Sequence, residues 1–471
     1  MKNLIGLACI TWYVFSSMIF SQSIEQSPLS GVEHIILPSN NEQHPCITEE
    51  EYASALKRCN QNASALNLNE HSTTHIAATS FQWPLRASAT LQDYSYYLIT
   101  NYVDDDTVKG SIKDYSCGKT TYDAHHGTDI VLWPFTMYKM DNNQVEVIAA
   151  APGIIIDKKD GFFDKNCVTN SGGTNYVIVQ HADGSRAYYW HLKKNSLTAK
   201  AIGQSVALGE FLAIVGSSGS SSIPHLHFEV LTGGAKPTLI DPYAGSCNSF
   251  NASSWWNVQK PYVEPAIVKL SLHSVKPVFP ACPATETLNE KFSFPSSTYG
   301  EALFYSFTRS ESLGMAANYR IVNPDGSTFS SWSSTSTTNY NATIRYWLKT
   351  LPTEPGTYLF EGTMNTITTS TPFQITGVTS VATQSPVSVL RVYPNPTQGN
   401  ITFDWGNESG VEHHASIEVY NILGVKVHQF ETVSARTELN LQLPTGIYFM
   451  QMKKEHTTVP LGKFILYSHY R

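Results

Sequence analysis

The stretch TNYVIVQHADGSRAYYWHL, residues 174–192, decides the fold of the central part of the chain. An apolar run and an aromatic run flank Asp183-Gly184, a dipeptide that favours a tight turn between antiparallel strands. Similar short runs surround it, such as QVEVIAAAPGIIIDKKDG at 144–161, which a Pro-Gly break divides into two strands. No part of this region alternates helices with strands, which disfavours a doubly wound sheet. We therefore predict a mainly β protein with a compact antiparallel sheet.

The composition agrees with an exported, β-rich protein. A chain of 471 residues is too long for one ordinary core and predicts about three folded units. Its 31 basic and 38 acidic residues form no basic cluster, which argues against nucleic acid as a partner. Only 15% of the residues are charged, while Ser, Thr, Tyr, Gly and Pro are plentiful.

Residues 1–21 read as a secretory signal peptide. Lys2 supplies the positive start, residues 4–20 are uncharged and mostly apolar, and Ser21 is a small residue for cleavage. An uncleaved membrane anchor is the alternative, because this apolar stretch is at the short end of a spanning length. No later segment is apolar enough to span a bilayer. We expect a secreted or cell-surface protein without a transmembrane segment after cleavage.

Residues 22–80 form a polar, partly helical segment that could be a pro-region. Within it, ITEEEYASALKRCNQNASALNL places three glutamates directly after Thr48, which is typical of a helix start. Apolar residues then recur at a helical period. We predict a helix that begins at Thr48, and its function is not readable from the sequence.

The cysteines indicate disulfide bonds. Of the seven, Cys9 lies in the signal peptide, and an even number remains in an exported chain. Six cysteines allow fifteen pairings. Proximity in the sequence suggests the pairs Cys46–Cys59, Cys117–Cys167 and Cys247–Cys282. None lies in a CxxC arrangement, so a cysteine zinc site is disfavoured.

Changes of composition divide the rest of the chain. The short β runs extend over 81–250, and serine- and threonine-rich strands over 255–380 predict an accessory β-sandwich. Inside the sandwich, SSWSSTSTTN at 330–339 reads as a loop. The Ser-, Thr- and Val-rich stretch 377–389 reads as a linker. A small β unit follows at 390–471.

Two short motifs supply candidate metal ligands. In PHLHFEV, the two-residue period of a strand places His225 and His227 on one face. In YDAHHGTDIVLW, His125 and Asp129 lie four residues apart and also share a face if the chain is extended. Either motif alone is more often a surface or packing feature than a metal site. Together they could meet across a groove and hold zinc, which takes nitrogen and oxygen ligands.

Other residues of the same region could join this site. His191, on the return strand of the hairpin, would share a face with Tyr189 and is a fifth candidate. Glu229 would share the face of the paired histidines and could support a ligand from behind. Tyr189 could line the groove or pack in the core. His126 and His181 are expected to be bystanders.

At this point the residues resemble a known family, the lysostaphin/LytM-type zinc metallopeptidases (peptidase family M23), over residues 81–250. Three motifs stand in the family's order: His125-x-Gly127-x-Asp129, Tyr189-x-His191-Leu192 and Pro224-His225-Leu226-His227-Phe228-Glu229. The GSSGSSS loop before the last motif and Asp241-Pro242 after it are also similar. These enzymes cut peptide bonds in bacterial peptidoglycan, and their fold is a compact antiparallel β domain.

The resemblance implies a role for each candidate. His125, Asp129 and His227 would bind one zinc ion per chain. His191 and His225 would be the catalytic histidines, which orient or deprotonate water and stabilise the developing oxyanion. A histidine suits this work because its ordinary pKa lies near neutral pH. The expected function is a secreted zinc metalloendopeptidase that acts on peptidoglycan cross-links.

The C-terminal unit has a resemblance of its own. VYPNPTQGNITF, VYNILGVKV and LPTGIYFMQM are similar to the sorting domain that directs proteins to type IX secretion. This implies the type IX machinery as a partner, export across the outer membrane, and either surface attachment or release. A generic adhesion module is the alternative.

Two further functions stay open at the level of sequence. A non-catalytic module of this fold could bind and activate other wall hydrolases, although the complete set of five candidate residues counts against it. A zinc protease that acts on glycine-rich extracellular proteins would use the same residues. The sequence does not say which bond is cut.

Overall fold

The computed structural model describes most of the chain as two units, which are treated separately below: residues 1–377 and 378–471. The described residues are 30–34, 47–68, 78–168, 172–297, 300–377, 391–404, 415–422, 424–432, 434–454 and 457–467. The expected signal peptide and nearly all of the expected linker lie outside these ranges. Within them, no helix has the length and apolar character needed to cross a membrane.

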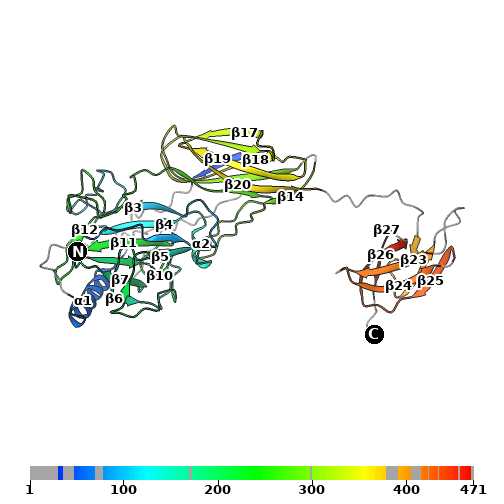
Figure 1. The fold of residues 1–471 in the computed structure, drawn as a ribbon, viewed down its shortest axis with the longest axis horizontal. Helices are drawn as coiled ribbons and strands as arrows, with labels where there is room; N and C mark the ends of the chain where they lie inside the picture. Colours follow the sequence, from blue (N-terminus) through cyan, green and yellow to red (C-terminus); the bar gives the residue numbers. More distant parts are fainter. Residues whose placement is uncertain are drawn as a thin grey trace, which may run out of the picture. The chain divides into compact units, whose positions relative to one another are not determined.

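The predicted hairpin is present at the centre of an eight-stranded sheet (Figure 1). Its turn depends on Gly184, whose φ of 86° is readily adopted only by glycine. The strands, in spatial order, are β3 (Tyr97–Asn101), β4 (Gly127–Leu132), β11 (His225–Leu231), β8 (Arg186–Trp190), β7 (Tyr176–Gln180), β6 (Gly153–Lys159) and β9 (Ser205–Val206), with β12 (Leu239–Ile240) paired to β11. All of these pairs are antiparallel, and the mainly β fold is confirmed.

A smaller sheet covers one face of the large sheet. It contains β10 (Phe211–Ile214), β5 (Val145–Ile148) and β2 (Leu85–Ala87), and the short helix α2 (Thr136–Asp141) precedes β5. Phe228 and Tyr189 of the large sheet share one core with Val147 and Leu212 of the small sheet, and all four are fully buried. Because side chains alternate along a strand, the opposite face carries His225, His227 and Asp129. We call this opposite face the histidine face.

The predicted helix is α1 (Glu49–Ala65), and it packs on the histidine face over β6, β7 and β8. The Thr48 hydroxyl accepts a hydrogen bond from the Glu51 amide and caps the first turn. Ala55, Cys59 and Ala63 recur every four residues and are buried against the sheet. The docked face of α1 is therefore a seam of small side chains.

The predicted accessory sandwich follows the large sheet in the chain. One of its sheets contains β1 (Ser30–His34), β18 (Tyr340–Thr350), β15 (Glu301–Glu311) and β13 (Ala266–His273). The other contains β14 (Ser293–Pro295), β20 (Ile367–Thr376), β19 (Gly356–Met364), β16 (Ala316–Val322) and β17 (Thr328–Thr335). Phe304, Ile321 and Phe360 are fully buried between the two sheets.

The prediction of a loop at 330–339 is wrong, because most of this stretch belongs to β17. Exposed serines alternate there with side chains that turn inward, and Trp332 packs against the sandwich core. The two-residue period of a strand was not apparent in this low-complexity stretch, because Trp332 is its only large side chain.

The sandwich docks on the histidine face at the edge formed by β3 and β4. Leu98 of β3, Val131 of β4 and Phe135 after β4 share an apolar cluster with Phe307 and Ile344 of the sandwich. All five side chains are nearly or fully buried. Polar contacts flank this cluster: the Trp133 indole donates to the Thr308 carbonyl at 3.0 Å, and the Arg309 guanidinium donates to the Tyr97 carbonyl at 3.1 Å.

The disulfide pairings suggested by sequence proximity are wrong for the four cysteines that the structure pairs. Cys117 bonds to Cys247 and Cys167 bonds to Cys282, over separations of 130 and 115 residues. The topology of the sheet, and not distance along the chain, brings these partners together. Cys59 is buried in α1 and has no disulfide partner among the described residues, while its suggested partner Cys46 lies outside them.

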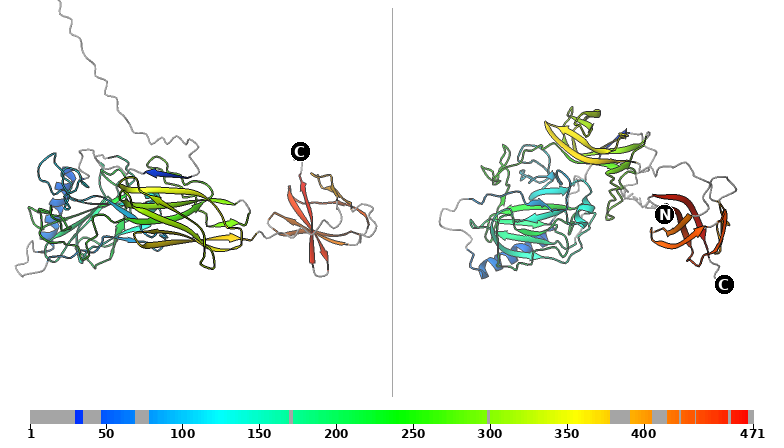
Figure 2. Two further views of the ribbon diagram at one scale, coloured as in Figure 1. Left: turned by 90° about the horizontal axis from the view of Figure 1, so that it is seen from above. Right: turned by 45° about the vertical axis from the view of Figure 1, so that its right-hand side comes forward.

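The C-terminal unit forms two small antiparallel sheets around one core (Figure 2). The first contains β21 (Arg391–Tyr393), β22 (Asn400–Asp404) and β25 (Arg436–Asn440). The second contains β24 (Lys426–Thr432), β23 (Ala415–Asn421), β26 (Gly446–Lys454) and β27 (Thr457–Leu466). Phe403, Ile417 and Phe464 are fully buried between them.

The docked sandwich leads to a prediction about stability. Replacing the buried Phe307 by Ala removes a large side chain from the interface, and we expect a loss of about 3–5 kcal/mol in unfolding free energy. Because Phe307 contacts both parts, the sandwich and the large sheet should still unfold together in a denaturant titration. The half-exposed Phe329 of β17, also changed to Ala, is the matched control. Unfolding of the sandwich that leaves the stability of the large sheet unchanged would contradict this coupling.

Candidate metal centre

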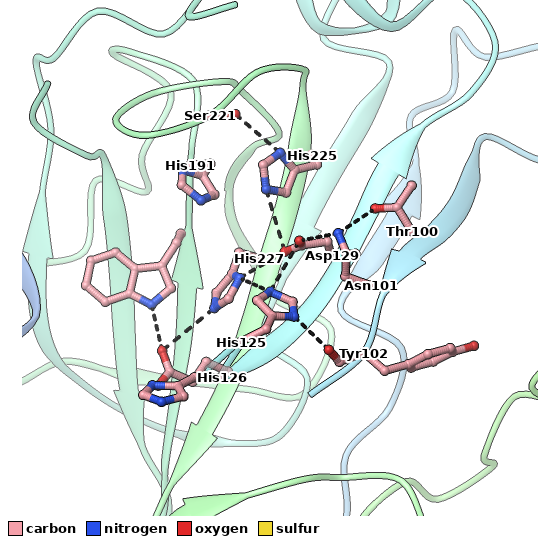
Figure 3. A network of polar contacts seen from close by, with 12 residues as sticks. Thr100, Asn101, Tyr102, His125, His126, Asp129, His191, Ser221, His225 and His227 are labelled. Atoms are coloured by element: carbon pink, nitrogen blue, oxygen red, sulfur yellow. Dashed lines mark hydrogen bonds and ion pairs between the residues drawn. The ribbon is translucent and has the colours of Figure 1, made fainter. Parts of the chain in front are cut away.

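The candidate ligands meet where β4 pairs with β11 (Figure 3). The register places His227 opposite Asp129 and His225 opposite Val131, so the two histidines and the aspartate lie on one face. His125 lies two residues before β4 begins and reaches the same point from the edge of the sheet. The structure thus brings together all three residues expected to bind metal.

Three ligand atoms converge closely. His125 Nε2 lies 3.1 Å from His227 Nδ1 and 3.2 Å from one Asp129 oxygen, and the other Asp129 oxygen lies 2.9 Å from His227 Nδ1. One ligand atom from each residue falls within 4.8 Å of the others. Their side chains are at most 3% exposed, so the centre is shielded from bulk water.

The surroundings fix the orientation of each ligand. His125 Nδ1 lies 2.7 Å from the Tyr102 carbonyl, which only accepts, so Nδ1 carries the hydrogen and Nε2 presents a lone pair. The Asn101 amide donates to Asp129 at 2.9 Å. Such outer contacts are typical of metal-binding histidines and carboxylates.

This arrangement fits a metal cation. A lone pair on His125 Nε2 faces His227 Nδ1 and a carboxylate, and a cation between them would relieve the repulsion. Burial raises the pKa of Asp129, but the neighbouring His125 and His227 hold that pKa well below its ordinary value. The carboxylate is therefore ionised, and two nitrogens with one oxygen form a donor set suited to zinc.

The two expected catalytic histidines lie beside this set, with ring centroids 4.5 Å apart. His225 Nδ1 lies 2.8 Å from the Ile223 carbonyl, and His191 Nδ1 lies 2.7 Å from the Ser218 carbonyl. Both Nδ1 atoms must donate to these carbonyls, so both neutral rings present a basic Nε2. His225 Nε2 lies 3.6 Å from Asp129, and His191 Nε2 is buried without a hydrogen-bond partner among the described residues.

The prediction that His191 lies on the strand and shares a face with Tyr189 is wrong. Strand β8 ends at Trp190, and His191 has a φ of 64°, a conformation that is rare for residues other than glycine. This left-handed turn directs the imidazole toward His225. Tyr189 lies on the core face, where its hydroxyl accepts a hydrogen bond from the Ala150 amide.

Glu229 lies behind the centre on the same face of β11. Its carboxylate accepts a hydrogen bond from the Trp190 indole at 3.2 Å and lies 3.9 Å from His227 Nε2. Helix α1 reaches this carboxylate through Tyr52, whose pKa is raised by burial and by the nearby charge of Glu229. The half-exposed His126 lies 3.7 Å from the same carboxylate. Glu229 thus connects α1 with the strand that carries His227.

The glycine-serine loop before β11 is buried and braced. The Asn166 side chain donates to the Gly219 carbonyl at 2.8 Å, and the Ser217 hydroxyl donates to the Asn166 carbonyl at 2.8 Å. The same loop supplies the Ser218 carbonyl that holds His191. Residues 165–168 therefore fix the loop that positions His191.

Sequence reasoning missed several of these supporting residues. Asn101, Asn166 and the carbonyls of Tyr102 and Ser218 carry no motif, because backbone carbonyls and single asparagines leave no pattern. His181, expected to be a bystander, is buried away from the centre and bonds to the Pro152 carbonyl at 2.9 Å.

An acidic pair lies next to the residue that holds the loop carrying His125. The Asp104 amide donates to the His125 carbonyl at 2.8 Å. The neighbouring Asp105 shares a hydrogen bond with Asp241, and both side chains are almost fully buried. Burial raises the pKa of Asp105 to about 6 and the pKa of Asp241 well above its ordinary value. The pair therefore holds a proton at a pH where exposed carboxylates are ionised.

Two family models match the chain. Residues 124–241 match peptidase family M23, and residues 391–466 match the secretion system C-terminal sorting domain. Residues 124–241 form a peptidase family M23 domain. Both resemblances seen in the sequence are thus confirmed, the M23 family implies a bound metal, and the sorting domain indicates a secreted or cell-surface protein.

A curated relative and solved structures also resemble the M23 domain. An uncharacterized metalloprotease of Haemophilus influenzae is 36% identical over 75 residues, which are 16% of this chain and 15% of that protein. The catalytic domain of the prophage-encoded M23 protein EnpA from Enterococcus faecalis, as a mutant, is 22% identical, with a TM-score of 0.20, and the match covers 35% of this chain and 94% of that one. A protein described as peptidase M23 from Pseudomonas aeruginosa is 19% identical, with a TM-score of 0.18, and the match covers 39% and 57%.

The acidic pair predicts a pH dependence of stability. Because both pKa values are raised in the folded M23 domain, the stabilisation is complete below the ordinary carboxyl pKa and is lost as the pH rises through about 6 and beyond. Asp241→Asn can donate to Asp105 at any pH, so its melting temperature should fall less than that of the wild type between acidic and mildly alkaline pH. Exposed Glu354→Gln is the control. Parallel curves for Asp241→Asn and wild type would refute the shared proton.

Proposed function

We propose that the protein is a secreted zinc metalloendopeptidase that hydrolyses peptide bonds of bacterial peptidoglycan cross-links. One observation carries the proposal: two buried histidines present a basic Nε2 beside a convergent set of His125, Asp129 and His227. The M23 family supports a peptidase and suggests peptidoglycan as substrate.

His125, Asp129 and His227 would hold the zinc ion. When bound, zinc supplies Lewis-acid polarisation of the scissile carbonyl and a lowered pKa for water. The protein keeps these ligands oriented through the Tyr102 carbonyl, the Asn101 amide and Glu229. No described lysine or arginine forms an ion pair with Asp129, so its charge is available to a cation.

His225 and His191 would move the protons. Each neutral ring has its hydrogen fixed on Nδ1 by a backbone carbonyl, so Nε2 can accept a proton from the attacking water. The resulting imidazolium can return that proton to the leaving amine. Between these steps, its N–H can stabilise the negative oxygen of the tetrahedral intermediate.

The remaining segments fit export and control. The sorting domain supports recognition by the type IX secretion machinery. We also propose that residues 22–80 are a pro-region, since α1 packs on the histidine face and its Tyr52 contacts Glu229. N-terminal sequencing of the active secreted protein should then find residues 22–80 removed, and their retention would contradict this role.

Two substitutions separate metal binding from proton transfer. His227→Ala should lose both the metal and hydrolysis. His225→Ala should keep about one zinc per chain, while hydrolysis falls by about 10²–10⁴-fold, the usual contribution of general acid–base catalysis. Metal content by elemental mass spectrometry and product identification from defined peptidoglycan fragments measure both effects, with His428→Ala of the C-terminal unit as control. Equal rates for His225→Ala and wild type would remove His225 from the mechanism.

Two other functions are outcomes of the same experiment. If wall lysis in a mixture with other hydrolases survives His227→Ala, the domain acts as a non-catalytic activator. If glycine-rich peptides are cut and peptidoglycan fragments are not, the substrate is an extracellular protein.

A further inference from the structure

A concave site lies between the M23 domain and the accessory sandwich. It is a cavity of about 280 Å³ next to edge strand β3. One side is lined by Tyr97, Tyr102 and the connecting segment 261–264, and the other by residues 309–312 and 339–341 of the sandwich. Ligand cavities commonly form at such junctions between domains.

The charged side chains of the lining are already neutralised. Arg309 pairs with Glu264 at 3.0 Å and also donates to the Ser95 hydroxyl and the Tyr97 carbonyl. Glu311 is bound by the guanidinium of Arg345 and by the hydroxyl of Ser336. Because these charges are compensated within the protein, the cavity offers no free charge to an anion or a cation. Its ligand is expected to be neutral.

The rest of the lining suits a polar ligand with flat apolar faces. Tyr262 and Tyr340 contribute partly exposed rings from opposite sides of the cavity. The amide of Asn341 and the hydroxyls of Ser310 and Ser312 have no hydrogen-bond partners among the described residues. Aromatic rings bind the apolar face of a sugar ring, while amides and hydroxyls bond to its hydroxyl and acetamido groups.

The backbone at the cavity is held in a costly conformation. Ser310 has a φ of 53° inside β15, between Arg309 and Glu311, which pair with Ala342 and Tyr340 of β18. Such positive φ values in residues other than glycine cluster at functional sites. Ser310 lies in the lining of the cavity.

The cavity is adjacent to the metal centre through β3. Tyr102 lines the cavity, and its carbonyl also holds the proposed ligand His125. The preceding residue, Asn101, donates to Asp129. A molecule bound in the cavity would therefore lie one strand away from the proposed site of hydrolysis.

We propose that this cavity binds a neutral sugar unit of the cell-wall glycan and thereby holds the glycan strand beside the metal centre. That the sugar comes from the bacterial cell wall rests on the proposed function. That the ligand is an uncharged saccharide rests on the lining of the cavity alone. The accessory sandwich then supplies half of a substrate-binding site.

The test uses the full-length protein and uncharged N-acetylglucosamine oligosaccharides, which carry no peptide. Calorimetry should show saturable binding by the wild type. Asn341→Ala and Tyr340→Ser should each weaken it about tenfold, the loss expected for one hydrogen bond or ring contact. Asn318→Ala, an exposed asparagine of the same sandwich outside the cavity lining, should bind like the wild type.

A second measurement separates this inference from the proposed function. The two cavity variants should cut a short glycan-free peptide at the wild-type rate, but their KM for intact wall should rise. Absence of oligosaccharide binding by the wild type, or equal binding by both variants, would overturn the sugar site. Binding of sugar without cleavage of any peptide would leave the sugar site standing and refute the peptidase.

Discussion

The antiparallel pairing of β4 with β11 is the constraint on which the rest of this structure depends. A shift of one residue in this register would turn His225 and His227 into the core and bring Leu226 and Phe228 to the histidine face. The core packing of Phe228 therefore enforces the position of the ligands. The alternation of side chains along β11 therefore determines both the packing of the core and the position of the candidate ligands.

Helix α1 and the sandwich both pack on the histidine face, on opposite sides of the centre. Helix α1 covers the aromatic rings on β7 and β8, and the sandwich covers the apolar side chains on β3 and β4. Together they remove from water a surface that a sheet alone would expose. The metal centre between them has low exposure, which strengthens every electrostatic interaction inside it.

The sequence predicted the fold, and it predicted which residues the structure brings together at the candidate centre, because both depend on local periodicity. The hairpin turn, the helix cap at Thr48 and the pairs of candidates two or four residues apart all follow from short-range rules. The disulfide pairs and the supporting Asn101 depend on contacts between distant segments, which no local rule supplies. His191 combines both cases: its motif marked it as a candidate, but its left-handed backbone was not foreseeable from strand alternation.

The Cys167–Cys282 bond links this chemistry to the cellular compartment. It ties the segment that braces the glycine-serine loop to the strand-rich part beyond residue 255. Such bonds form and persist in oxidising surroundings and are rare in a reducing cytosol. For a secreted protein, the disulfide bond next to the loop that orients His191 therefore forms only after the chain has left the cytosol. The compartment in which the protein matures thus affects how firmly this part of the centre is held.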